Sequence, residues 1–289
     1  MWLTHILFSA VLLAFYDASI KHGIRANAVF AVLLPATLCG ALALAAFLGA
    51  TSGLADAVFC EPAWVWRAAV KAALASGSWA CMFYALRALP ISIATPIQSS
   101  TPLWTLLGAI LLFGEAPSRG QAAGMALVLA GYLAFAFAGR REGVPFTRGG
   151  VVFAFAGTLL GATSALFDKH LFGVLQGPRG AVQLWAYGWT ALAFASALWI
   201  RHAFGLARTP FTWRWTIPQV GILLAASDFL YFAAVGAPGT QIAIVSLLRR
   251  TSVVAAFLLG VFVFKERNIA RKALALAILL AGVAVLCLA

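Results

Sequence analysis

The chain has 289 residues, of which 63% are hydrophobic and only 10% are charged, and its formal net charge is +12. This leaves too little polar surface for a soluble domain of this length. The composition therefore excludes an ordinary soluble enzyme or binding protein. A basic balance suggests nucleic acid binding in a soluble chain, but in a membrane protein it raises the question of which side carries the Lys and Arg residues. We expect an all-α integral membrane protein that binds no nucleic acid.

Ten segments are long and apolar enough to cross the hydrocarbon core as helices, which takes about 20 residues each. The connections between them are short, and the longest, 50–63 and 202–215, are too small for a soluble catalytic domain. No cleavable signal precedes the first span, so we expect that span to be retained. In chain order the predicted spans are 2–20, 28–49, 64–86, 91–113, 119–139, 149–171, 181–201, 216–236, 240–264 and 268–288.

The second half of the sequence repeats the first. Residues 15–133 correspond to residues 166–284 at a constant offset of 151, so Asp17 corresponds to Asp168 and Glu115 to Glu266. Residues 1–140 and residues 141–289 each hold five spans, and an odd number of spans makes the second half enter the membrane from the opposite side. We therefore expect one transmembrane domain built from two inverted five-helix repeats, an architecture that suits alternating access.

Positive charges are distributed unevenly between the two predicted faces. The connections after spans 1, 3, 5, 7 and 9 carry 13 Lys and Arg residues, and the opposite face carries five. The positive-inside rule places the richer face in the cytoplasm and both termini outside the inner or plasma membrane. The richer set is Lys21, Arg25, Arg87, Arg140, Arg141, Arg148, Arg201, Arg208, Arg214, Lys265, Arg267, Arg271 and Lys272, and the poorer set is Arg67, Lys71, Arg119, Lys169 and Arg179.

The segment from the third to the fourth span carries a recognisable signature. Residues 85–96 read Ala-Leu-Arg-Ala-Leu-Pro-Ile-Ser-Ile-Ala-Thr-Pro and continue through Thr101-Pro102 to Phe113-Gly114-Glu115. This stretch resembles EamA-type members of the drug/metabolite transporter superfamily, and residues 246–252 through 264–266 resemble the matching part of the second half. The resemblance covers nearly the whole chain. It implies a ten-helix fold with a central cavity lined by both halves and secondary transport of small metabolites, often export.

Arg249 and Arg250 lie near the middle of the ninth span, where the first half has Gln98 and Ser99. An ionisable side chain at the bilayer centre costs at least about 2.5–3.5 kcal/mol on insertion scales unless it finds a partner or water. Because adjacent helical residues diverge by about 100°, only one arginine can point into a central cavity. That arginine would suit a carboxylate or phosphate group of a substrate, unless both arginines form structural pairs. The acids available for pairing are Asp17, Asp168 and Asp228.

Three acidic residues are predicted to act in gating or ion coupling. Asp17 and Asp168 lie near the C-terminal ends of corresponding spans, which inverted repeats would place at opposite mouths, and Lys21 follows Asp17 at ion-pair spacing. The alternative is that both acids only end helices at the interface. Proton coupling requires a deeply buried carboxylate, for which Asp228 is the candidate, and exchange of a second solute is the alternative.

Aromatic and uncharged polar side chains complete the predicted substrate cavity, although each aromatic could instead pack or anchor the protein at the interface. Trp185, Tyr187 and Trp189 alternate along the sequence and cannot share one helical face, so we interpret them as lipid-facing or packing residues. Trp213 and Trp215 indicate an interfacial belt. Besides the two arginines, the predicted cavity residues are Trp79, Tyr84, Gln98, Ser99, Thr101, Trp104, Tyr16 and Tyr231.

Small residues and prolines indicate where helices approach or bend. Gly124, Gly131 and Gly282 in the fifth and tenth spans permit close packing, either within one chain or in a homodimer through these spans. Pro96 and Pro102 inside the fourth span free backbone carbonyl groups and permit a kink that could take part in gating.

Motifs for other chemistries are absent. There is no Walker A sequence and no HExxH, and Cys39, Cys60, Cys81 and Cys287 lack the spacing of a metal site. We therefore expect no enzyme activity, no catalytic residue, no metal and no cofactor, and a small organic metabolite as the partner. Two other functions stay open: a lipid or headgroup flippase or scramblase, recognised by a cavity open sideways to lipid, and a membrane scaffold or receptor that transports nothing.

Overall fold

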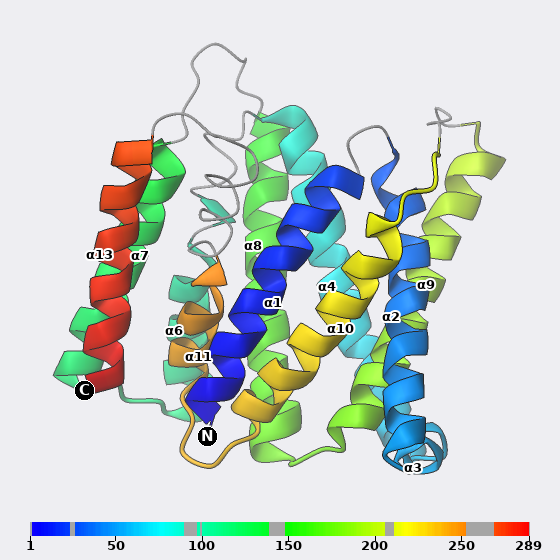
Figure 1. Ribbon diagram of the computed structural model, residues 1–289, viewed down its shortest axis with the longest axis horizontal. Helices are drawn as coiled ribbons and strands as arrows, with labels where there is room; N and C mark the ends of the chain where they lie inside the picture. Colours follow the sequence, from blue (N-terminus) through cyan, green and yellow to red (C-terminus); the bar gives the residue numbers. More distant parts are fainter. Residues whose placement is uncertain are drawn as a thin grey trace.

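The computed structural model describes residues 2–23, 27–89, 97–98, 100–138, 148–205, 211–252 and 269–288, and every regular element in these ranges is helical (Figure 1). The expected all-α character is therefore confirmed. The first half contains α1 (Trp2–Gly23), α2 (Val29–Ala50), α3 (Leu54–Val58), α4 (Pro62–Ala88), α6 (Thr101–Phe113) and α7 (Arg119–Ala138). The second half contains α8 (Arg148–Asp168), the π-helical turn η1 (Lys169–Val174), α9 (Arg179–Ala203), α10 (Thr216–Val235), α11 (Ile242–Arg249) and α13 (Ile269–Leu288).

Several helices have the length and apolarity of membrane spans. Among the described residues three helices meet both criteria, Val29–Ala50, Arg148–Val174 and Thr216–Val235. Shorter apolar stretches lie in α1, α6 and α13. A helix of 20 residues is about 30 Å long, which matches the hydrocarbon core of a bilayer. The chain is thus built as a multi-pass membrane protein.

Helix ends follow local sequence signals. Pro62 stands in the first turn of α4, where its missing N–H costs nothing. Gly114 ends α6 with a left-handed φ of 64°, which a glycine adopts without steric penalty. At the start of α7, Ser118 and Gln121 form a reciprocal capping box, with N···O distances of 2.9 and 3.1 Å.

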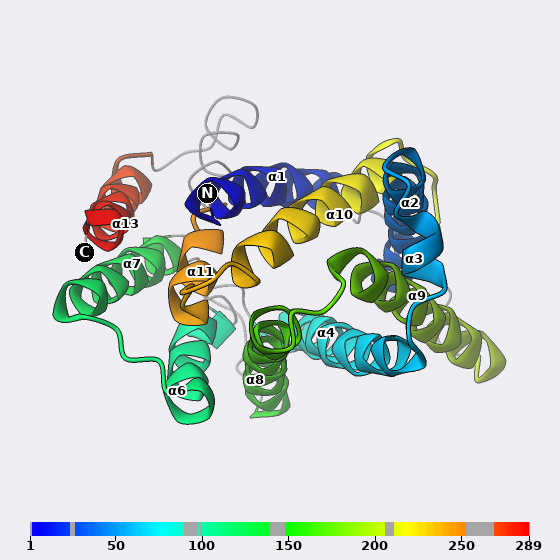
Figure 2. The ribbon, with the colours of Figure 1, turned by 90° about the horizontal axis from the view of Figure 1, so that it is seen from below.

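The helices run roughly side by side between two ends of the molecule, here called the lower and upper faces as drawn in Figure 1. The lower face contains the loops 51–61, 114–118, 175–178 and 236–241 together with the start of α1 and the end of α13. Seen from below in Figure 2, α1 and α10 run side by side, opposite α4 and α8, while α7 and α13 form a pair at one edge.

Helix packing follows the correspondence between the two halves of the sequence. The contact of α1 with α10 has a counterpart in the contact of α8 with α4, and the contact of α2 with α10 has one in α9 with α4. The contacts of α2 with α9, and of α7 with α13, join corresponding helices directly. In Figure 1, α1 starts at the lower face and its counterpart α8 starts at the upper face.

The predicted spans differ from the observed helices in three places. The loop 50–63 contains the short helix α3, and the sixth span continues past Asp168 through the π-helical turn to Val174. The fourth and ninth spans are not continuous helices. Ser100 lies in a turn directly before α6, and Arg250 and Thr251 lie in a turn directly after α11. Pro102 consequently occupies the first turn of α6 and not a mid-helix kink, and Pro96 lies outside the described residues.

Polar groups inside the bundle are paired across helices. Ser9 in α1 and Ser227 in α10 are fully buried, and each hydroxyl donates to the backbone carbonyl of the other residue at 2.8 and 2.9 Å. Such reciprocal bonds satisfy hydroxyls that would otherwise lack a partner in hydrocarbon. This clamp fixes the relative height of α1 and α10.

Gly131 of α7 and Gly282 of α13 allow these two helices to pack closely within one chain. A Cβ atom on Gly131 would lie 2.5 Å from the backbone nitrogen of Leu279, and one on Gly282 would lie 2.5 Å from that of Val128. The absence of side chains therefore allows the two helix backbones to touch. The intramolecular interpretation accounts for both glycines without a second copy of the chain.

We predict that Gly282→Ala destabilises the protein by about 1–3 kcal/mol, because the added methyl group overlaps backbone atoms of α7 that cannot move independently. Thermal unfolding of the purified protein in detergent measures this loss as a lower midpoint temperature. Gly149→Ala is the matched control, since no atom lies within 4 Å of a Cβ there. Equal midpoints for the two variants would contradict the close α7–α13 contact.

Candidate functional site

Two broken helices meet inside the bundle. The break before α6 includes Ser100, and the break after α11 includes Thr251, which corresponds to Ser100 at the offset of 151. The helices α6 and α11 also contact each other. The described backbone N–H groups at the breaks are bonded within the turns, from Ser100 to the Ile97 carbonyl and from Thr251 to the Leu248 carbonyl. Interrupted helices at matching positions of a repeated sequence are where membrane carriers commonly bind their substrates.

Arg249 ends α11 and forms an ion pair with Asp228 of α10. The positive side chain at a helix C-terminus also interacts favourably with the free carbonyl groups there. Its guanidinium carbon lies 4.1 Å from the centroid of the Tyr231 ring, a cation–π geometry. Tyr187 of α9 donates a hydrogen bond to the second carboxylate oxygen of Asp228 at 3.3 Å. Asp228 thus holds together α9, α10 and α11.

A second ion pair joins α4 to α8. Lys71 donates a hydrogen bond to Asp168, and the side chains are only 11% and 5% exposed. The Lys71 ammonium also lies 4.7 Å from the centroid of the Phe232 ring. Tyr231, which is 3% exposed, lies within hydrogen-bonding reach of Asp168 as well as beside Arg249. The two ion pairs therefore form one buried cluster around Tyr231 and Phe232.

The charged residues of this cluster lie at a common depth. At 1.5 Å per helical residue, each is roughly 9–14 Å from the lower end of its own helix. A bilayer core is about 30 Å thick, so the cluster lies between a third and half of the way across. At that depth a charge is stable only beside a partner or water. The four residues are Lys71, Asp168, Asp228 and Arg249.

Arg250 differs from Arg249. It lies in the turn that follows α11, it is partly buried, and its guanidinium has no ion-pair partner within the described part of the chain. The sequence had left open whether one arginine contacts a substrate or both form structural pairs. A partly buried guanidinium without a carboxylate can accept an anionic group of a ligand.

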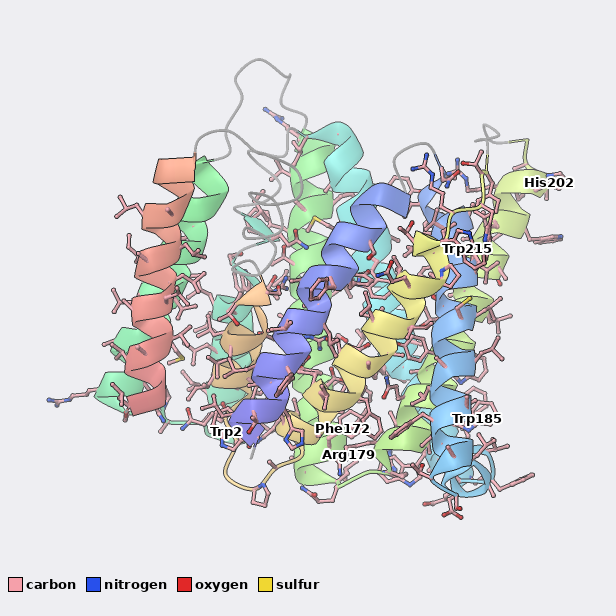
Figure 3. All side chains as sticks on the ribbon, viewed as in Figure 1. Trp2, Phe172, Arg179, Trp185, His202 and Trp215 are labelled. Carbon is pink, nitrogen blue, oxygen red and sulfur yellow. The ribbon has the colours of Figure 1, made fainter. Side chains whose placement is uncertain are left out.

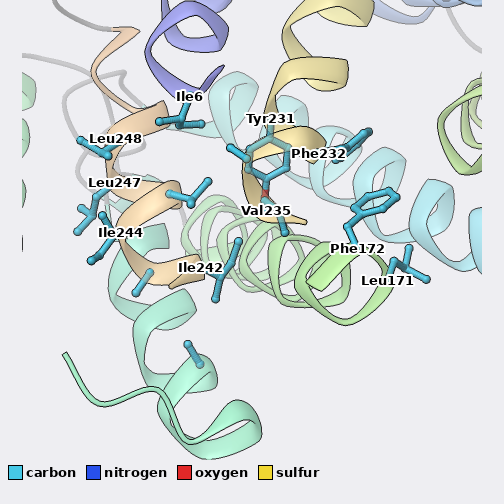
Figure 4. Packing of buried hydrophobic residues seen from close by; sticks show 14 of the residues in the cluster. Ile6, Leu171, Phe172, Tyr231, Phe232, Val235, Ile242, Ile244, Leu247 and Leu248 are labelled. Carbon is cyan, nitrogen blue, oxygen red and sulfur yellow. The ribbon is translucent and has the colours of Figure 1, made fainter. Parts of the chain in front are cut away.

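A polar pocket of about 460 Å³ opens on the lower face. It lies between the end of η1, the start of α9 and the loop after α10, and Arg179 and Gln176 are among its lining residues. Phe172 closes its inner end, with its ring centroid 4.5 Å from that of Phe232 (Figure 4). Both rings are almost completely buried. This ring pair separates the lower pocket from Lys71.

A second pocket, of about 490 Å³, is apolar and lies between α6 and α8. Trp104 and Phe155 line it and are 37% and 42% exposed, so it opens on the outer side of the bundle. Ser100 at the helix break also lines it, and accepts a hydrogen bond from the Trp104 indole at 3.2 Å. The break before α6 is therefore reachable from an apolar flank of the protein.

The structure brings four of the predicted site residues together and leaves the others apart. Arg249, Asp228, Tyr231 and Asp168 share the buried cluster, while Gln98 and Trp104 flank the break before α6. Trp79 stacks on Phe194 of α9, and Tyr84 packs against Phe153 of α8. Ser99 lies outside the described residues, and the side chains of Asp17 and Lys21 are not described.

Several sequence interpretations need correction. Asp168 is not at a mouth, because η1 extends the helix by six residues beyond it and carries the mouth further down. Lys71 and Lys169 are not loop charges, since Lys71 is buried in α4 and Lys169 donates to the Thr240 carbonyl inside the protein. Tyr187 does not face lipid, because it is 6% exposed and bonded to Asp228.

Two cluster residues were missed by the sequence interpretation. Lys71 was assigned to a face by counting charges, although a lone lysine nine residues into a long apolar helix is itself a sign of an internal partner. Tyr187 was set aside because its aromatic neighbours alternate with it. The period of α9 places Trp185 and Trp189 on a different side, where their indoles donate to backbone carbonyls of Ala57 and Val65.

No group of three or more His, Cys, Asp or Glu side chains within the described ranges could hold a metal ion. The free cysteines Cys39, Cys60 and Cys81 are partly buried and unpaired. The buried charges therefore serve each other or a ligand.

We predict that Asp168→Asn destabilises the folded protein by about 3–5 kcal/mol, because it leaves the buried Lys71 ammonium without a partner. The double variant Lys71→Met with Asp168→Asn should recover most of this loss, since no unpaired charge remains. Chemical unfolding in detergent measures both effects. Asp56→Asn, which removes an exposed acid of α3, is the control. Additive losses in the double variant would contradict the pairing.

Comparisons with known proteins agree with this architecture. The sequence profile described as the EamA-like transporter family matches residues 1–137. One solved structure, described as "Crystal structure of protein", is similar with a TM-score of 0.75 and 20% sequence identity, over 99% of this chain and 96% of that chain. At this identity the similarity concerns the fold alone. No curated protein matches the chain significantly.

Proposed function

The chain belongs, through residues 1–137, to the EamA-like transporter family, part of the drug/metabolite transporter superfamily, and on this premise we propose that it is a secondary transporter of a small organic metabolite. It is a membrane transporter by family, and the finer points of substrate, direction and coupling are proposals. The observation that carries the substrate proposal is the pair of matching helix breaks, at one of which Arg250 has no ion-pair partner among the described residues. We further propose an anionic group on the substrate, which would bind Arg250.

We propose that residues 1–140 and 141–289 are two inverted repeats of five spans that form one transmembrane domain. Three observations support this. The helix contacts recur in corresponding pairs, α1 and α8 start at opposite faces in Figure 1, and the helix breaks coincide at the offset of 151. Two similar halves can exchange conformations, so that one face opens as the other closes around a fixed site. The protein would therefore work by alternating access.

The upper face is proposed to be cytoplasmic, in the cell or inner membrane, with both termini outside. Lys71 and Lys169 bind partners inside the protein, so they do not count as charges of the lower face. Of the five positive residues assigned to that face, Arg67, Arg119 and Arg179 then remain, and Arg67 stacks on Trp64 at 4.5 Å. The difference in positive charge between the two faces is thus larger than the sequence count implied. Exposed tryptophans near both faces suit the two bilayer interfaces, such as Trp215 near the upper face and Trp66 in α4 (Figure 3).

Export is the direction that the family resemblance favours. A carrier's direction is set by the gradients of its substrate and of its coupling solute, and not by its fold. Proton coupling through Asp228 would require Arg249 to leave this carboxylate during the cycle, because the ion pair occupies it. Exchange for a second solute requires no such step.

We also propose a homodimer that forms through α7 and α13. Its contacts would use the outer faces of these helices, because their glycines already pack against each other's helix within one chain.

A lipid or headgroup flippase is the second candidate, because the apolar pocket between α6 and α8 opens sideways beside the break at Ser100. Proteoliposomes separate the two functions. A flippase accelerates loss of fluorescence from nitrobenzoxadiazole-labelled lipid on addition of dithionite, whereas a metabolite carrier shows counterflow of a water-soluble compound. Lipid exchange without counterflow of any metabolite would reject the transporter proposal.

The substrate site is tested with a thermal-shift screen of the purified protein against a metabolite panel, because a ligand that binds the native state raises the unfolding temperature by mass action. We predict that an anionic metabolite stabilises the protein. Arg250→Gln should weaken its binding about tenfold or more, the effect of losing a charge-assisted hydrogen bond. It should leave the unfolding temperature without ligand unchanged, because Arg250 forms no ion pair with any residue that the structure describes.

Arg249→Gln is the matched comparison. It should lower the unfolding temperature without ligand, since it leaves Asp228 unpaired. Arg119→Gln, at an exposed arginine of α7, should change neither property. A response confined to cationic compounds, retained in Arg250→Gln, would reject the anion site and direct attention to Asp228 and Asp168.

A further inference from the structure

Glu115 connects three segments of the lower face. It directly follows Gly114, whose left-handed conformation ends α6 and turns the chain toward α11. One carboxylate oxygen accepts a hydrogen bond from the backbone N–H of Ile242 at 2.9 Å. The same oxygen lies 3.9 Å from the Lys169 ammonium. Lys169 in turn donates a hydrogen bond to the backbone carbonyl of Thr240.

The contact with Ile242 places a negative charge at the start of α11. Ile242 is the first residue of that helix, and the first N–H groups of a helix have no partner within it. A carboxylate there satisfies one of them and interacts favourably with the helix dipole. Since α11 is only eight residues long, the position of Ile242 sets the position of Arg249 at its other end.

The contact with Lys169 ties α11 to the π-helical turn. The two side chains are shielded, with 8% of Glu115 and 15% of Lys169 exposed. Lys169 directly follows Asp168, so the contact is adjacent to the buried pair with Lys71. The loop after α10 and the end of η1 also line the lower pocket. Separation of these two segments would break the contact of Lys169 with Thr240, and movement of η1 away from the loop after α6 would break its contact with Glu115.

The polar groups around the contact of Glu115 with Lys169 are incompletely hydrogen-bonded. Three buried oxygen atoms there have no hydrogen-bond partner among the described residues: Glu115 Oε2, Thr240 Oγ1 and Gln241 Oε1. Buried polar atoms are nearly always paired in stable interfaces, and unpaired ones cost free energy. Water that enters when the segments separate would satisfy them. The contact is therefore held by few bonds and is suited to opening.

We propose that Glu115 and Lys169 form an ionic latch that holds the lower face closed, and that Glu115 is the positioning residue for α11 and Arg249. The proposal rests on the transporter function proposed above, since a latch has meaning only in a protein whose two faces open alternately. Breaking the ion pair would shift the population toward states open on the lower face.

Accessibility of one cysteine tests the latch without any substrate. The reporter is Ala68→Cys in a background without the four native cysteines, because Ala68 is fully buried in α4 in the same core cluster as Phe172 and Phe232. A membrane-impermeant thiol reagent is applied to the lower face in proteoliposomes. Glu115→Gln keeps an acceptor for Ile242 but removes the charge, and Lys169→Met removes the ammonium.

The latch predicts that either variant raises the labelling rate about tenfold or more, the change expected when a shielded ion pair loses one partner. The double variant should label no faster than Lys169→Met alone, because that variant already lacks the ion pair that Glu115→Gln removes. Glu61→Gln and Arg119→Gln, which remove exposed charges of the lower face, should label at the original rate. A reporter at Ala237, which lines the lower pocket, should react in every variant.

Unchanged labelling at Ala68 in both variants would overturn the latch, and so would equal increases in the two exposed-charge controls. General unfolding is recognised by a second reporter, Ala154→Cys, which is fully buried in α8 on the contact with α4 and should stay protected. Faster labelling at Ala154 as well would overturn the latch, because the variant then loosens the whole bundle. Faster labelling at Ala68 in a protein that moves no metabolite would keep the latch and reject the transport proposal.

Discussion

A charge buried in hydrocarbon is stable only beside an opposite charge, and this requirement organises the centre of the molecule. Lys71 with Asp168 joins α4 to α8, and Arg249 with Asp228 joins α11 to α10. The first pair joins helices that are far apart in the sequence, and the second joins two consecutive helices. The aromatic rings of Tyr231 and Phe232 lie between the pairs and interact with both cations. Helix positions that the apolar contacts leave adjustable are thereby fixed around the site.

The proposed duplication extends to the helix contacts but not to most of the charged residues at the centre. Several contacts between helices recur between their counterparts, and the fourth and ninth spans are broken at corresponding positions. Of the charged residues at the centre, Asp168 has an acidic counterpart in Asp17, whereas the others have uncharged counterparts: Ile222 for Lys71, Gly77 for Asp228, Gln98 for Arg249 and Ala18 for Lys169. The two halves therefore contribute equally to the framework and unequally to the site. Glu115 keeps an acidic counterpart, Glu266, so the acid after the fourth span belongs to the repeated framework.

Hydropathy and the internal repeat predicted the helices well, because membrane helices need long apolar segments and both signals extend over many residues. The pairing of Arg249 with one of three acids followed from the energy of buried charge. The choice between Asp228 and Asp168 did not follow from the sequence, because it depends on how α10 and α8 pack relative to α11. The helix breaks at Ser100 and Arg250 were also missed, since the residues around them remain apolar and a half-helix has the same composition as a whole one. Lys71 was misplaced because a count of charges between spans takes no account of depth.

The guanidinium of Arg250, which has no ion-pair partner in the described ranges, has an electrical consequence. The other described charges around the helix breaks cancel in pairs, so the empty site carries one net positive charge from this residue. A bound monoanion would make the loaded carrier neutral, and the membrane potential would then act on the return of the empty carrier and not on the loaded step. A potential of 100 mV changes the energy of one elementary charge moved fully across the membrane by about 2.3 kcal/mol. The resting voltage of the cell would thus set how fast the empty protein resets, even though the cargo crosses without a net charge.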